Sequence, residues 1–133
     1  MSGKADTSLD LANLDTAALC ERGAELELAH PGTGAPLGVF VTVAGVDSRT
    51  WRRAQNAVSE KRRSRRGPLT GEEIRAGQAE ILARCTLAWR GVTFEGAELP
   101  CTVENARMLY TRLPWMADQL DAFASDRASY LRD

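Results

Sequence analysis

Two short stretches early in the chain alternate between hydrophobic and polar positions. In residues 24–30 leucines and alanines alternate with glutamates, and in residues 38–44 valines occupy every second position. An extended chain places alternate residues on opposite faces, so both stretches are predicted to be β-strands. Residues 31–36 between them contain the prolines and glycines typical of a long hairpin loop. Because two strands alone are marginally stable in water, helices are expected to cover the apolar face of this hairpin.

Helical spacing replaces the alternation after the hairpin. Asp47 and Ser48 can accept hydrogen bonds from the free N–H groups that begin a helix, and residues 49–66 contain neither glycine nor proline. Within that range a narrow apolar stripe recurs at helical intervals, and it consists of Trp51, Ala54 and Val58. We therefore expect a helix that ends at the glycine–proline pair of residues 67–68.

Residues 70–73 (TGEE) form a capping-box pattern, which opens the clearest helix of the chain. Glycine is common just after the last turn of a helix, so this helix is predicted to end at Gly91. The apolar stripe between these points is wide, which indicates a helix that lies in the core. Its members are Ile74, Gly77, Ile81, Leu82, Cys85, Ala88 and Trp89.

The last third of the chain is predicted to contain two further helices. Residues 92–100 are broken by glycine and proline and are too short to separate two domains. Thr102 can cap a helix that continues to Leu113, and Pro114 suits the first turn of a final helix. One face of that final helix is apolar and carries Met116, Leu120, Phe123, Tyr130 and Leu131.

Signals at the N-terminus are weaker. Residues 1–7 have little to bury and are expected to be frayed, while residues 8–22 fit a short helix only loosely. Together the patterns predict a single α+β domain over residues 1–133. Its N-terminal β-hairpin packs against about four α-helices, and its C-terminal two-thirds is mostly helical.

Composition narrows the function classes. The 133 residues carry 17 basic and 18 acidic side chains, which argues against a protein dedicated to nucleic acid or membrane surfaces. The cysteines Cys20, Cys85 and Cys101 lack the spacing of a metal motif and are interpreted as buried thiols in a reducing compartment. No apolar run approaches the roughly 20 residues of a membrane span, and the first ten residues are polar, so a cytoplasmic protein is expected.

Positive charge is concentrated in one part of the chain. Eight of the 17 basic residues lie within residues 49–66, against a single acid, Glu60. Residues 61–69 are interpreted as a basic segment that can act as a mobile linker. Three uses stay open: a solvated segment, a surface for an acidic protein partner, and, least favoured, a contact with nucleic acid. The eight residues are Arg49, Arg52, Arg53, Lys61, Arg62, Arg63, Arg65 and Arg66.

Candidate catalytic chemistry is sparse. The single histidine, His30, lies at the hairpin loop and is interpreted as a turn residue. Two acid pairs, within residues 72–73 and 118–121, are interpreted as solvated helix faces rather than catalytic dyads. The sequence also lacks the common motifs of hydrolases, nucleotide-binding proteins and zinc enzymes. We therefore expect a protein that is not an enzyme, with no catalytic residues, no cofactor and no metal.

Five stretches carry a family resemblance: 28–34 (LAHPGTG), 43–48 (VAGVDS), 89–96 (WRGVTFEG), 99–106 (LPCTVENA) and 115–123 (WMADQLDAF). In this order they resemble the tail assembly chaperone families of long-tailed, siphophage-type bacteriophages and prophages. The resemblance implies a small non-catalytic protein that keeps the long tape measure protein soluble and helps tail tube subunits polymerise around it. It also implies partners, namely the tape measure protein and the tail tube protein, with self-association in addition, in the cytoplasm of the bacterial host. The basic residues 62–66 depart from the family's pattern.

These considerations suggest where partners bind. We hypothesise a partly apolar groove between the last helices that binds helical segments of the tape measure protein. Trp115, at a helix start, is expected to be half exposed, whereas Trp51 and Trp89 are expected in the core. The candidate partner-binding residues are Trp115 and Met116 as anchors, with Arg62, Arg63, Arg65 and Arg66 as a basic patch.

Two other classes of function stay open. One is a structural virion component, such as a head–tail joining or tail terminator protein, which would be found in purified particles. The other is a small DNA-binding protein that uses the basic helix of residues 49–66 and binds with a steep dependence on salt.

Overall fold

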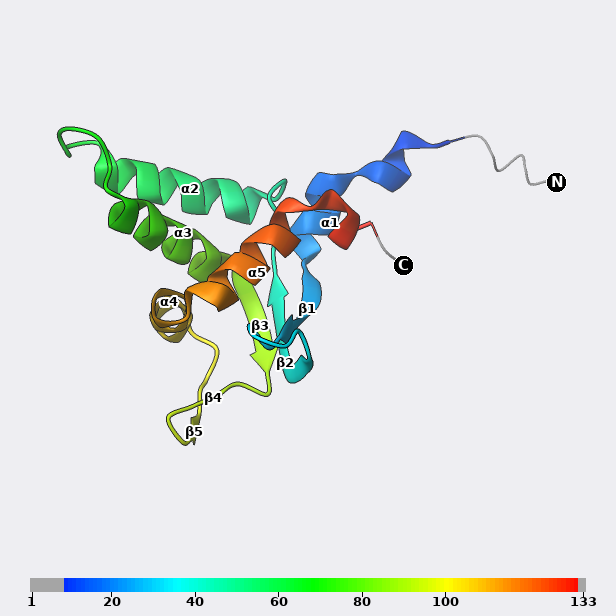
Figure 1. The fold of residues 1–133 in the computed structure, drawn as a ribbon. Coiled ribbons are helices and arrows are strands. Elements are labelled where there is room, and N and C mark those ends of the chain that lie inside the picture. Colours follow the sequence, from blue (N-terminus) through cyan, green and yellow to red (C-terminus); the bar gives the residue numbers. More distant parts are fainter. Residues whose placement is uncertain (1–8, 132–133) are drawn as a thin grey trace.

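The computed structural model describes residues 9–131, so the expectation for residues 1–7 lies outside the described residues. The helices are α1 (Thr16–Arg22), α2 (Arg49–Arg62), α3 (Gly71–Cys85), α4 (Val103–Arg112) and α5 (Pro114–Ser125), with the 3-10 turns η2 (Leu11–Leu14) and η3 (Arg127–Ser129). The strands are β1 (Ala24–Ala29), β2 (Pro36–Val43), β3 (Thr86–Arg90), β4 (Thr93–Phe94) and β5 (Ala97–Glu98). Figure 1 shows the sheet packed against helices, which confirms the predicted α+β fold class.

The sheet is antiparallel, with the strand order β1-β2-β3. Its first two strands are the predicted hairpin, and Val41 at the centre of β2 pairs with Leu26 on one side and Trp89 on the other. Val41 and Val43 are fully buried, so the predicted apolar face of the hairpin does pack against the helices. A second hairpin, β4–β5, occupies part of residues 92–100, a segment for which the sequence predicted no strand.

The prediction that the helix starting near residue 70 continues to Gly91 is wrong for residues 86–90. α3 ends at Cys85, and the chain continues directly into β3 with extended backbone at Thr86. The spacing of the apolar residues Cys85, Ala88 and Trp89 is compatible with a helix. As a strand, however, residues 86–90 form backbone hydrogen bonds with β2, whereas the last carbonyl groups of a helix have no partner within the helix. Gly91 then ends the strand in the left-handed region (φ 77°), where an added Cβ would lie 2.4 Å from the carbonyl oxygen of Gly38.

The predicted helix starts are confirmed. Ser48 Oγ accepts a hydrogen bond from the backbone N–H of Trp51, at 3.0 Å, and Thr70 and Glu73 form a complete capping box. Thr102 caps α4 and Pro114 occupies the first turn of α5. α2 ends at Arg62, four residues before the end that the sequence predicts.

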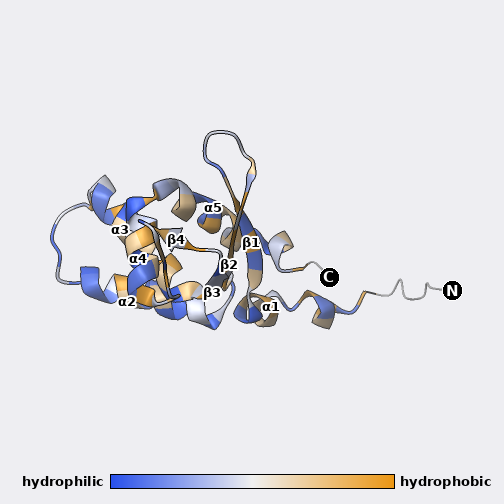
Figure 2. Ribbon diagram, turned by 90° about the horizontal axis from the view of Figure 1, so that it is seen from below, coloured by the Kyte–Doolittle hydropathy of each residue, from blue (hydrophilic) through white to orange (hydrophobic). Residues whose placement is uncertain are grey.

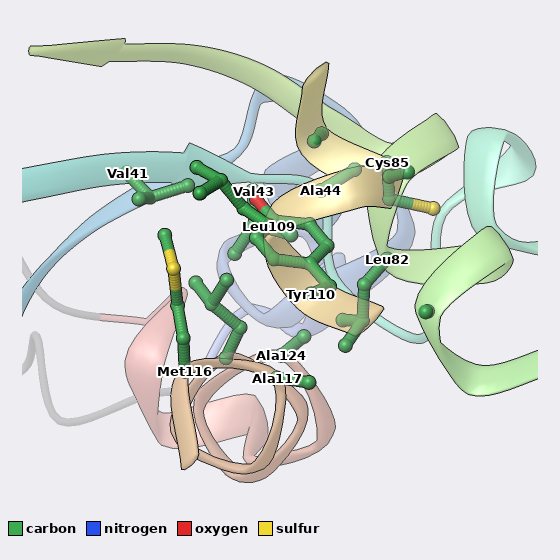
Figure 3. Close-up of a cluster of buried hydrophobic side chains, with 14 of the residues drawn as sticks. Val41, Val43, Ala44, Leu82, Cys85, Leu109, Tyr110, Met116, Ala117 and Ala124 are labelled. Carbon is green, nitrogen blue, oxygen red and sulfur yellow. The ribbon is translucent and has the colours of Figure 1, made fainter. Parts of the chain in front are cut away.

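The core lies between β2 and the helices α3, α4 and α5. Figure 3 shows Val41 and Val43 facing Leu82, Leu109 and side chains of α5. Trp51 is also buried, as predicted, whereas Trp89 is half-buried on β3 and donates its indole N–H to the carbonyl of Leu99, at 2.9 Å.

The cysteines divide into two kinds. Cys20 and Cys85 are fully buried, as predicted, and burial raises the pKa of the Cys85 thiol to about 12. The expectation that Cys101 is buried is wrong, because it lies exposed in the loop that leads to α4. None of the helices within residues 9–131 is long and apolar enough to cross a membrane.

Candidate partner-binding groove

A groove of about 510 Å³ lies where α3 passes between α2 and α5. We call it the three-helix groove. α3 supplies its floor, α2 one wall and α5 the other. The side chains that line it are Trp51, Gln55 and Arg62 from α2, Ile74, Arg75, Gly77, Gln78 and Ile81 from α3, and Asp118 and Asp121 from α5.

The floor of the groove is apolar and partly open to solvent. Ile74 is 56% exposed, although its position on the apolar stripe predicts a core residue. The prediction fails because an apolar stripe does not specify which of its residues a neighbouring helix covers, and Ile74, near the start of α3, stays largely uncovered. Ile81, two helical turns further on, is half-buried against the core. Among residues 9–131, the one buried side-chain nitrogen or oxygen without a hydrogen-bond partner is Nε1 of Trp51, another residue of the groove.

Gly77 determines how closely α2 approaches the floor. A Cβ at this position would lie 2.2 Å from an Nη atom of Arg62. The Arg62 guanidinium therefore crosses α3 above Gly77, and it donates to the carbonyl oxygen of Glu73 at 2.7 Å. A larger residue would displace Arg62 and widen this end of the groove.

Two carboxylates form the wall on α5. Asp118 is exposed and forms a long ion pair with Arg75, with 3.4 Å between Oδ1 and Nη1. Asp121 is half-buried, and burial raises its pKa, an effect that a hydrogen bond from Gln78 opposes. The interpretation of this pair as a fully solvated helix face is therefore wrong for Asp121.

A second cavity, of about 630 Å³, lies on the other side of the same part of α3. Arg75 and Gln78 line both cavities, so the exposed N-terminal half of α3 forms a ridge between them. The remaining lining residues of the second cavity are Gly71, Glu72, Ala76, Tyr110, Thr111 and Pro114.

The four predicted basic partner residues serve different purposes. Arg65 clamps the carboxylate of Glu73 with two nitrogens, and this hydrogen bonding lowers the Glu73 pKa to about 2. Together with Arg62 it ties the loop after α2 to the start of α3. Arg63 and Arg66 are exposed on this hydrophilic loop, which Figure 2 shows in blue. Arg63 forms a surface ion pair with Glu60 at 3.1 Å, so of the four it is Arg66 whose charge is presented to a partner without a carboxylate beside it among the described residues.

The two predicted anchors also differ. Met116 is 2% exposed and points into the core from α5, toward Val41 in Figure 3. The expectation that Met116 forms part of a surface groove is therefore wrong. Trp115 is half-buried against the core cluster, in keeping with the expected half exposure, and its contact with a partner stays a prediction.

The candidate catalytic groups are dispersed or structural. Nδ1 of His30 accepts hydrogen bonds from the N–H groups of Gly32 (3.0 Å) and Thr33 (3.2 Å), which confirms its interpretation as a turn residue. Within residues 9–131, no group of three or more His, Cys, Asp or Glu side chains is placed to hold a metal ion.

Comparisons with protein-family models, curated proteins and solved structures found no match to this chain. The resemblance to tail assembly chaperones therefore rests on the five sequence stretches alone. These lie mainly at strand ends and loops, and the last of them, residues 115–123, lies on α5. Asp118 and Asp121 belong to this last stretch and also line the three-helix groove.

Proposed function

We propose that this chain is a non-catalytic tail assembly chaperone of a long-tailed bacteriophage or prophage. It binds amphipathic helical segments of the tape measure protein, keeps that protein soluble and assists polymerisation of the tail tube protein. It acts in the cytoplasm of the bacterial host. The observation that carries the proposal is the three-helix groove, with Ile74 exposed on its floor between charged walls.

The groove suits a helical segment for geometric reasons. Ile74 and Ile81 are seven residues apart on one helix, so they present two apolar contact points roughly 10 Å apart. Large side chains of an amphipathic helix recur at similar distances along one face. Covering an exposed isoleucine contributes on the order of 1 kcal/mol to binding.

The proposed binding site for the tape measure protein differs from the one that the sequence suggested. The sequence hypothesis put the groove between the last helices and used Met116 as an anchor, whereas Met116 is buried. The groove formed by α2, α3 and α5 takes its place, with Ile74 as the exposed anchor.

The test is co-expression of the chain with the tape measure protein encoded in the same phage or prophage genome. We expect the wild-type chain to hold the tape measure protein in the soluble fraction and to be recovered with it. Ile74→Asp places a charge on the groove floor at an exposed position, so it should weaken recovery at least tenfold without unfolding the chain.

Leu87→Asp is the matched control. Leu87 is 44% exposed on β3 and outside the groove, so its substitution should change recovery less than twofold. Equal loss with both variants would contradict the groove as the binding site. Failure of the wild-type chain to bind or solubilise the tape measure protein would contradict the proposed function.

One observation favours a second candidate, a small DNA-binding protein. Arg49, Arg52 and Arg53 are exposed on the first turns of α2, where they lie near the carboxylates of Asp15, Glu21 and Asp47. Binding of duplex DNA that weakens steeply between 50 and 200 mM salt, roughly as expected for several phosphate contacts, would favour this alternative.

A further inference from the structure

The two walls of the three-helix groove carry opposite charges. On α2, Trp51, Gln55 and Arg62 are spaced by four and seven residues, so they lie along one side of the helix. All three line the groove, which makes this side the α2 wall. Its charged member is Arg62.

The α5 wall has the opposite sign. Pro114, Asp118, Asp121 and Ser125 are spaced by four, three and four residues and likewise share one side of their helix. Asp118 and Asp121 line the groove, and both of its charged members are carboxylates.

The one cation that faces this acidic wall from the floor is weakly held. Arg75 pairs with Asp118 across 3.4 Å, and more than half of each side chain is exposed to water. Such pairs are weak, because water competes for both charges. A basic residue of a bound helix can therefore replace Arg75 as the partner of Asp118 at little cost in free energy. It can pair with Asp121 without breaking an ion pair.

From this arrangement we propose that the groove selects an amphipathic helix whose apolar face is edged by basic residues on one side and acidic residues on the other. The basic edge lies against Asp118 and Asp121, and the acidic edge lies toward Arg62. The inference rests on the proposed function, since it specifies the chemistry of the tape measure segments that this site binds. Helices with the same charge on both edges are rejected, because one edge always meets a wall of like charge.

The charge pattern also sets the direction in which the helix lies. Turning a helix end for end exchanges its two edges while its apolar face still points at the floor. A helix with exchanged edges therefore fits the same groove with its N- and C-termini reversed. The walls thus determine orientation, whereas the apolar floor alone would accept both directions.

The isoleucines give a direct assay of this inference. The chain contains two isoleucines, Ile74 and Ile81, and both lie on the groove floor. Methyl labelling of isoleucine in the full chain therefore gives NMR signals from the groove alone. The probes are three synthetic 18-residue helical peptides with the same leucine stripe, whose edges are Lys and Glu, Lys and Lys, or Glu and Glu.

We expect the peptide with mixed edges to bind about tenfold more tightly than either of the others at low salt. A paramagnetic label on its N-terminus should broaden one isoleucine methyl signal more than the other. The same label on a peptide with exchanged edges should reverse which signal is broadened. These two results together support the inference.

Charge reversal of the acidic wall should change the selection. With Asp118→Lys and Asp121→Lys combined, both walls are basic, so the Glu and Glu peptide should become the tightest binder. The matched control is Glu98→Lys, an exposed residue of β5 outside the groove, which should leave the preference unchanged. If the lysine double variant does not fold, Asp118→Asn with Asp121→Asn should reduce the tenfold preference to less than threefold.

Several outcomes would overturn the inference. Equal affinity of the three peptides, equal broadening of both isoleucines, or binding of none of the peptides would each do so. Recovery of the tape measure protein in the co-expression experiment is measured separately. A chain that recovers it through Ile74 but shows no charge preference would retain the proposed function and lose only this inference.

Discussion

The most informative perturbation of stability is Glu80→Gln. Glu80 is 8% exposed on α3, and its carboxylate accepts hydrogen bonds from Arg84 Nε at 2.6 Å and from Arg107 Nε at 2.5 Å. Arg107 belongs to α4, so this cluster joins two helices of the core. Glutamine preserves the shape of the side chain and removes its charge.

The expected magnitude follows from the pKa of Glu80. The hydrogen bonds from Arg107, followed by those from Arg84, lower it from 4.5 to about 2 against the opposing effect of burial. A change of this size corresponds to about 3 kcal/mol of preference for the ionised carboxylate in the folded state. The arginine side chains stay 39% and 42% exposed, and water can solvate them in the variant. We therefore expect a loss of about 2 kcal/mol in the free energy of unfolding at pH 7.

The pH dependence gives the sign of the effect. A carboxyl whose pKa is lowered by folding stabilises the protein above its unfolded pKa, here 4.5, and loses that contribution as the pH falls toward 2. The difference between wild type and Glu80→Gln should therefore shrink to less than half by pH 3. Glu73, whose pKa is also about 2, contributes equally to both proteins and cancels in the difference.

The assay is urea unfolding of both proteins at pH 7, 4 and 3. The control is Glu60→Gln, since Glu60 pairs with Arg63 on the surface at 3.1 Å with both side chains mostly exposed. We expect that control to change the free energy of unfolding by less than about 0.5 kcal/mol. A difference for Glu80→Gln that is the same at pH 7 and pH 3, or no larger than that of the control, would refute the reasoning.

Three further predictions concern the sheet and its connection to the helices. Gly91→Ala should lower the free energy of unfolding by about 2 kcal/mol or more in urea titrations, because a Cβ there meets the carbonyl oxygen of Gly38 and the backbone φ is positive. Ser48→Ala should cost about 1–2 kcal/mol in the same assay, since the fully buried Ser48 both caps α2 and donates to a carbonyl 2.7 Å away. Gln119→Leu should raise the fraction of chain that sediments as aggregate at high concentration, because the Gln119 amide now pairs with both backbone groups of Ala29 at 2.9 Å on the outer edge of β1.

The sequence by itself determined the features that depend on local interactions. The starts of α2, α3 and α4 were predicted because the caps at Ser48, Thr70 and Thr102 bond to backbone groups within three residues. The β1–β2 hairpin was predicted because alternation of side chains along one strand already specifies which face is buried.

The tertiary structure decided the features that depend on residues far apart in the chain. β3 replaces the end of a predicted helix because its backbone pairs with β2, more than 40 residues earlier. Ile74 was expected in the core and is exposed, whereas Met116 was expected at a binding surface and is buried. Burial depends on which helices cover each face, and an apolar stripe in the sequence does not specify which helix covers it. The three-helix groove also depends on tertiary packing. Its floor and its two oppositely charged walls come from three helices that lie side by side only in the folded chain.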